Sequence, residues 1–189
     1  MKENDDGLRA TAFHEAGHVF MFELVGLEYE DVSINGEEGI VNGYDNIKTD
    51  NMLNKFIFAC ICFSGSIAED LYIYPIRLDD ALESIYESDL YGSSLNGSGK
   101  ADNDKYEEMG MGLDGCYKKS LLKVTRKIIV DSWSMVSIIA NSLAEHKRLT
   151  DKEVKKLLGD FKLKEKYDIS ILELQAILYY MGRDSPSID

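Results

Sequence analysis

The feature that most constrains this chain is a pair of histidines four positions apart, in the segment His14-Glu15-Ala16-Gly17-His18. Around this segment, residues 8–25 carry apolar side chains at helical spacing, and Gly26 marks the end of the pattern. Positions i and i+4 of a helix lie on one face, so both imidazoles can reach the same metal ion. The segment therefore predicts an amphipathic helix that presents two metal ligands side by side.

Glu15, directly after the first histidine, adds the chemistry of a hydrolase. Catalytic zinc is held by three protein ligands and keeps one position open for water. The ion lowers the pKa of that water to about 7, and a neighbouring carboxylate can take its proton. The spacing H-E-x-x-H also arises by chance on surface helices. Here two of the chain's three histidines form the pair, and apolar residues flank it, which favours a true site.

Ala16 and Gly17, between the two histidines, are small. A glycine inside a helix costs about 1 kcal/mol relative to alanine. Gly17 therefore indicates that another element approaches the helix closely at this point.

The third ligand is expected to be a carboxylate. The glycine and the further histidine that follow in the metzincin pattern are missing, since Met21 and Leu24 stand at those two offsets after His18. The remaining histidine, His146, lies near the end of a predicted helix and is expected to be exposed.

Three acidic residues are candidates for this ligand. Asp104 is preferred, because it follows the Gly/Ser-rich segment 92–99 and opens a predicted helix, where a short carboxylate is well tolerated. Glu69 is the main rival, and it also suits an outer role, accepting the free N–H of a ligand imidazole and fixing its tautomer. Asp102 is the weaker rival.

The rest of the pattern predicts a mainly helical protein with a small β element of two to three strands. Residues 31–34 and 39–41 are expected to be strands joined by a turn that contains Asn35-Gly36. Helices are expected at 50–71 with an interruption at Gly65, at 79–89, from near 102 to a break at 110–112, at 117–146, at 150–158 behind a capping box, and at 174–181. Residues 1–160 form the expected domain, and 161–189 a C-terminal helical extension.

The charge balance limits the partners. Lys and Arg number 21 and Asp and Glu 34, which gives a net charge of −13. Such a surface repels nucleic-acid phosphates and anionic lipid headgroups. The longest uninterrupted apolar run, residues 56–63, is far shorter than the roughly 20 residues of a membrane span. We expect neither nucleic acid nor membrane contact.

The cysteines and the N-terminus indicate a cytoplasmic protein. Cys60, Cys62 and Cys116 are odd in number and lack the spacing of a disulfide framework, so reduced thiols are expected. Cys60 and Cys62 lie in an apolar run and are expected in the core. The first residues are acidic, unlike a secretory signal.

Several segments together resemble the peptidase domain of the FtsH family of ATP-dependent zinc proteases. Residues 11–18, Thr-Ala-Phe-His-Glu-Ala-Gly-His, are similar to its active-site signature. In the same order follow segments similar to its strand pair (32–34 and 39–44), to its G-G-R-A-A-E-E-L block (64–71), to its G-A-x-N-D block (101–104) and to the end of its last helices (143–158). The resemblance implies a helical zincin-like fold, zinc ligands His14, His18 and Asp104, and Glu15 as the base.

The function that the resemblance implies is a zinc metalloendopeptidase acting on unfolded or flexible protein segments. In the family, the strand equivalent to Gly39, Ile40 and Val41 lies beside the active site, and a substrate could add there as a further strand through main-chain hydrogen bonds. Such binding would select little for side chains.

The departures from the family concern its other modules. The sequence contains no G-x-x-x-x-G-K-[ST] loop for an ATPase, and Ser66 replaces the basic residue of the G-G-R block. A free-standing peptidase domain is therefore expected, with a separate ATPase or further copies of itself as candidate partners.

Two other interpretations stay open. The zinc site could be part of a non-catalytic or regulatory module that binds a protein through its acidic surface, although a purely structural site has no need of Glu15. The chain could also be a small intracellular zincin of the ImmA-like kind, although the segments at Glu69 and at Asn103-Asp104 fit the FtsH pattern better.

Overall fold

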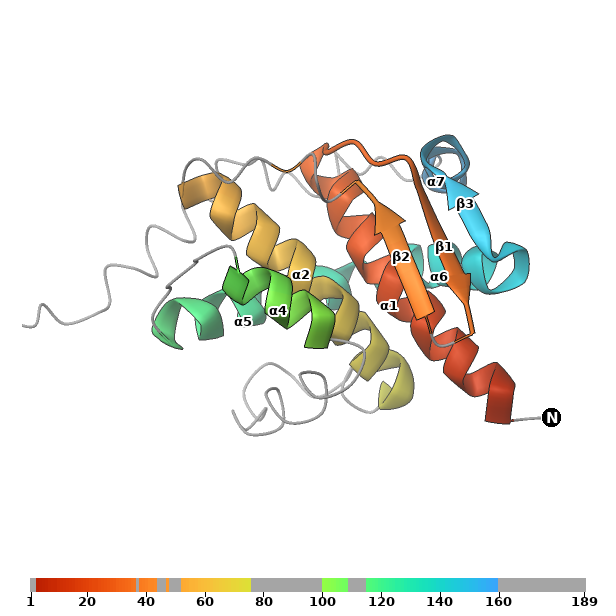
Figure 1. The fold of residues 1–189 in the computed structure, drawn as a ribbon, viewed down its shortest axis with the longest axis horizontal. Helices are drawn as coiled ribbons and strands as arrows, with labels where there is room; N and C mark the ends of the chain where they lie inside the picture. Colours follow the sequence, from red (N-terminus) through yellow and green to blue (C-terminus); the bar gives the residue numbers. More distant parts are fainter. Residues whose placement is uncertain are drawn as a thin grey trace, which may run out of the picture.

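The computed structural model describes residues 3–36, 38–43, 47, 52–75, 100–108 and 115–159. The architecture over these residues is mainly helical with a small three-stranded antiparallel sheet, as the sequence predicted (Figure 1). The elements are α1 (Glu3–Val25), β1 (Asp31–Asn35), β2 (Glu38–Asn42), α2 (Met52–Ile73), α4 (Lys100–Glu108), α5 (Gly115–Asp131), α6 (Trp133–His146), β3 (Arg148–Thr150) and α7 (Asp151–Leu158).

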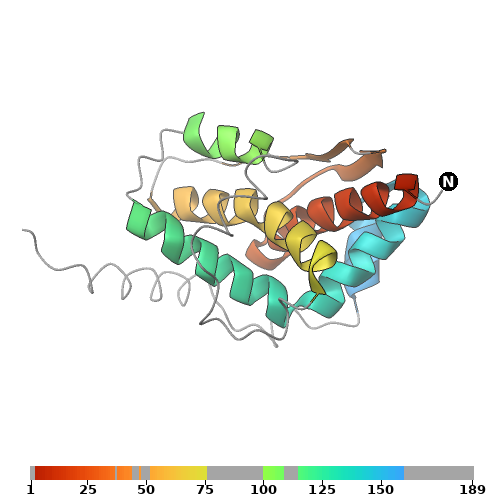
Figure 2. The same ribbon diagram turned by 90° about the horizontal axis from the view of Figure 1, so that it is seen from below.

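Helix α1 is the centre of the fold. Every residue from Thr11 to Phe22 is buried, which is the pattern of a helix covered on all sides. Helices α2 and α6 and strands β1 and β2 pack against it (Figure 1). Helix α2 lies in turn between α4 and α5 (Figure 2). The histidine pair of α1 is therefore enclosed by the other elements of the fold.

Gly17 lets α1 and α2 approach each other closely. A Cβ atom on Gly17 would lie 2.4 Å from the backbone oxygen of Ser64 and 2.9 Å from the Cβ of Ala68. Real side chains never come that close to a backbone atom, so only glycine permits this contact. The close approach predicted from the small residues between the histidines is confirmed.

The sheet has the order β2-β1-β3. Strands β1 and β2 pair antiparallel from Asp31 opposite Asn42 to Asn35 opposite Glu38, so the predicted strand pair is confirmed. Strand β3 pairs antiparallel with the other edge of β1, with Asp31 opposite Thr150. Three residues are too few for a recognisable alternation, so the sequence did not locate β3; its pairing with a distant strand defines it.

The helix expected over 117–146 is two helices, α5 and α6, which meet at Ser132; the backbone N–H of Ser132 donates to the carbonyls of Ile128 and Ile129. Helix α7 begins with the predicted capping box between Thr150 and Glu153. The expectations for 79–89, 92–99, 110–112 and 161–189 lie outside the described residues.

Helix α2 contains a segment, Asn54–Ile73, that is long and apolar enough to cross a membrane by length and composition. The longest uninterrupted apolar run, residues 56–63, covers only part of this segment, because Ser64, Gly65 and Ser66 interrupt the run. These three residues do not make the helix polar on average. In the fold, 78% of its most apolar window is buried, and a core helix meets the same criterion. Cys60 and Cys62 are free thiols buried in this helix, as expected.

Candidate metal centre

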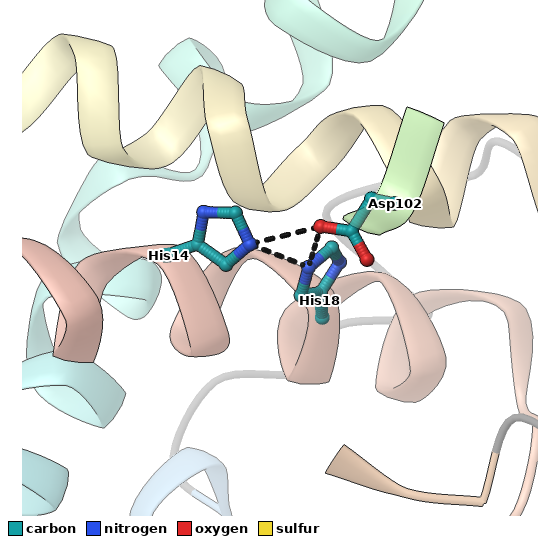
Figure 3. A group of neighbouring side chains, drawn as sticks. All are labelled: His14, His18 and Asp102. Atoms are coloured by element: carbon teal, nitrogen blue, oxygen red, sulfur yellow. Dashed lines mark hydrogen bonds and ion pairs between the residues drawn. The ribbon is translucent and has the colours of Figure 1, made fainter. Parts of the chain in front are cut away.

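Three buried side chains from two helices converge at one point. Helix α1 supplies His14 and His18, and α4 supplies Asp102 (Figure 3). The Oδ2 atom of Asp102 lies 2.9 Å from Nε2 of His14 and 3.1 Å from Nε2 of His18, and the two Nε2 atoms are 3.1 Å apart. The three atoms therefore form a nearly equilateral triangle.

The outer nitrogens of the two imidazoles fix their tautomers. Nδ1 of His14 lies 3.0 Å from Oε2 of Glu69, and Nδ1 of His18 lies 2.7 Å from the backbone oxygen of Ile61. A carboxylate and a carbonyl only accept hydrogen bonds, so each Nδ1 is the donor. In the neutral imidazole, Nε2 then carries the lone pair. When both imidazoles are neutral, two nitrogen lone pairs and a carboxylate oxygen thus face one another.

This arrangement fits a metal ion. Three acceptor atoms at such distances repel unless a metal ion or a shared proton lies among them. Tetrahedral zinc, with ligand distances of about 2.0–2.2 Å, holds its ligand atoms about 3.4 Å apart. The triangle is tighter than that by only a few tenths of an ångström. Two imidazoles and one carboxylate are also a common ligand set of catalytic zinc sites.

Gly65 keeps the space next to the triangle open. A Cβ atom on Gly65 would lie 2.3 Å from Nε2 of His18 and 2.7 Å from Nε2 of His14. The sequence predicted an interruption of the helix at this residue, but α2 runs through it from Met52 to Ile73. The glycine has a steric role instead, because α2 passes the centre with bare backbone.

The electrostatics of the centre favour a positive charge. Burial lowers the pKa of His14, but hydrogen bonds with Asp102 and Glu69 and the charge of Glu15 outweigh burial and raise that pKa to about 10. Burial raises the pKa of Asp102, but the charge of His18 and the hydrogen bonds with both histidines hold it well below its usual range. A divalent cation would be stabilised by the same carboxylates.

Glu15 lies against β2. A Cβ atom on Gly39 would lie 2.5 Å from both Cγ and Oε1 of Glu15, so strand and carboxylate are in direct contact. Glu15 is buried, and burial raises the pKa of its carboxyl, while the charges of His18 and His14 lower it and leave a net rise.

The sequence predicted Asp104 as the third ligand. Asp102, and not Asp104, lies beside the histidines, and Asp104 is exposed on α4. Residues two positions apart on a helix point to nearly opposite sides, so only one of them can face α1. The rotation of α4 about its own axis decides which one, and no local pattern in the sequence specifies that rotation.

The other predicted residues are distributed as follows. Glu69 contacts Nδ1 of His14, which is the outer role that was predicted for it as an alternative to binding the metal. In β2, Gly39 faces Glu15, the side chain of Ile40 is 53% exposed, and Val41 is buried in the core. His146 is exposed, as expected.

Lys105 was not anticipated by sequence reasoning. Its Nζ lies 3.7 Å from Oδ1 of Asp102, one helical turn away. A lysine three residues after a candidate ligand is too common to serve as a signal.

Comparisons with known proteins give no match: neither protein-family models nor curated proteins are similar to this sequence at a significant level.

Proposed function

We propose that this protein is a zinc-dependent metalloendopeptidase with the ligands His14, His18 and Asp102 and with Glu15 as the general base. The observation that carries the proposal is the buried triangle of two Nε2 atoms and one carboxylate oxygen, with a buried glutamate directly after the first histidine. Three protein ligands leave a fourth position of zinc open, which is the pattern of catalytic and not of structural sites.

The chain's own residues supply the remaining chemistry. When bound, zinc would provide an activated water and polarise the carbonyl of the scissile bond. Glu15 takes up and returns a proton at its carboxylate, and burial raises the pKa of this group, which makes it a better proton acceptor than an exposed glutamate. Glu69 and the carbonyl of Ile61 hold the two imidazoles in the tautomer that directs Nε2 to the ion.

The neighbouring strand supports an extended peptide as the substrate. Among the described residues, β2 is an edge strand that pairs only with β1, and Glu38, Gly39 and Ile40 are exposed. A peptide could pair with this edge through main-chain hydrogen bonds, directly beside Glu15. Only an unfolded or flexible segment can adopt that conformation, which favours an endopeptidase with little side-chain selectivity.

The segments similar to the FtsH family favour the same function. Asp102 departs from that pattern, which ends at the position of Asp104. We extend the proposal to a helical zincin-like fold and to a separate ATPase or a homo-oligomer as the partner. We also propose a cytoplasmic location, which the free thiols of Cys60 and Cys62 support.

The substitution Glu15→Gln tests the proposed mechanism. Glutamine has nearly the same shape but accepts no proton, so the variant should bind zinc like the wild type and lose cleavage of unfolded casein by about 100-fold or more. Zinc content by atomic spectroscopy and the rate of casein cleavage are the two measurements. Equal cleavage rates for both proteins at equal zinc content would contradict the proposal.

A further inference from the structure

Gly39 occupies an ordinary extended position in β2, where glycine is not required by the backbone. The described glycines with positive φ are Gly26, Gly36 and Gly43, and Gly39 is not among them. Glycine inside a strand is unfavourable and often marks the close approach of another group. The glycine is therefore explained by a group that lies next to it.

The neighbour is a single side chain. The three atoms nearest to a Cβ on Gly39 all belong to Glu15: Cγ and Oε1 at 2.5 Å and Cδ at 2.7 Å. Gly17 differs in this respect, because the two atoms nearest to its Cβ are backbone atoms of Ser64. A methyl group on residue 39 would be accommodated by displacing the Glu15 carboxylate, and the strand itself could stay in place.

We propose that Gly39 is a positioning residue for Glu15: the bare backbone of β2 seats the Glu15 carboxylate between α1 and the edge of the sheet, beside the metal centre. This inference rests on the proposed function insofar as Glu15 is the base. It differs from the role expected from the sequence, in which Gly39 contacts the substrate.

The two roles predict different kinetics. Loss of a substrate contact raises KM, whereas a displaced general base lowers kcat at unchanged KM. A misplacement of about 1 Å costs up to roughly 100-fold in rate, so Gly39→Ala should lower kcat by at least about 10-fold while its zinc content stays at the wild-type level. The matched control is Gly159→Ala at the C-terminal cap of α7, where the backbone is right-handed helical and the added Cβ would lie 3.4 Å from its nearest neighbours.

A second measurement detects the contact without any activity. Thermal melts of wild type, Gly39→Ala, Glu15→Ala and the double variant, all at the same zinc saturation, form a double-mutant cycle. Gly39→Ala should lower Tm by about 2–4 °C when Glu15 is present. The loss should vanish in the Glu15→Ala background, because the colliding atoms are gone. Effects of alanine on the unfolded chain are the same in both backgrounds and cancel.

The outcomes separate this inference from the proposed function. If the wild type cleaves no peptide, the proposed function fails, while the melts still decide whether Gly39 seats Glu15. Additive changes in Tm would overturn the inference. An unchanged kcat in the Gly39→Ala variant would also overturn the inference, provided that Glu15→Gln inactivates the enzyme.

Discussion

Each imidazole of the centre is held by contacts at both of its nitrogens. Nε2 faces the triangle, while Nδ1 donates to Glu69 in one case and to the carbonyl of Ile61 in the other. An imidazole fixed in this way loses little freedom when an ion binds, which favours affinity. Gly65 contributes by carrying no side chain at the point where one would collide with both Nε2 atoms.

The identity of the carboxylate can be tested by comparing two aspartates of the same helix. Removing a hydrogen-bond partner of a metal ligand costs roughly 10–100-fold in metal affinity. Asp102→Ala removes a ligand itself and should weaken zinc binding by more than that. Asp104→Ala should keep the wild-type affinity, because Asp104 is exposed and does not face the histidines. Titration with a chromophoric zinc chelator measures both. Loss of zinc in Asp104→Ala with retention in Asp102→Ala would reverse the assignment.

At the scale of elements, the Asp31 carboxylate joins the three strands. The Asp31 carboxylate on β1 accepts hydrogen bonds from Arg148 on β3 and from Asn42 on β2. Burial raises the pKa of Asp31, but these two partners outweigh burial and hold the pKa below its usual range. A group with a lowered folded-state pKa stabilises the fold above its unfolded pKa, and this contribution is lost as the pH falls through the folded value.

Asp31→Asn should therefore lower Tm at pH 7, and the difference from wild type should shrink as the pH falls below about 3.9, the ordinary pKa of an aspartate. Thermal melts at pH 7 and at successively lower pH values measure the difference. Asp131→Asn is the control, because its ion pair with Lys127 is exposed on both sides and such pairs contribute little. A difference between Asp31→Asn and wild type that is independent of pH would show that the charge of Asp31 does not matter.

At the scale of the whole molecule, the centre joins segments that are far apart in the chain. Asp102 lies 88 residues from His14 and 84 from His18. Helix α4 packs on α2, and its Asp102 side chain reaches the histidines of α1 (Figures 2 and 3). An ion bound by all three side chains would therefore bind the folded state and not the unfolded chain, which stabilises the fold by mass action.

Removal of zinc should accordingly lower the melting temperature. At a free zinc concentration of about 100 times Kd the stabilisation is about 2.7 kcal/mol, which corresponds to a Tm shift of roughly 5–10 °C for a chain of this size. Scanning fluorimetry of zinc-loaded protein with and without a chelator measures the shift, and Asp102→Ala should show little of it. Equal melting temperatures in a sample shown to lose its zinc would contradict a site that joins distant elements.

The sequence by itself determined the features that depend on neighbours along the chain. His14 and His18 share a face because of helical spacing, the strand pair follows from β-branched residues on both sides of an Asn-Gly turn, and the Thr150 capping box needs only four consecutive residues. The tertiary structure alone decided the placement of Asp102 and not Asp104 beside the histidines, the pairing of β3 with β1, and the close contacts at Gly39 and Gly65. Those features depend on the rotation and closest approach of elements that are distant in sequence, and local patterns carry no information about either.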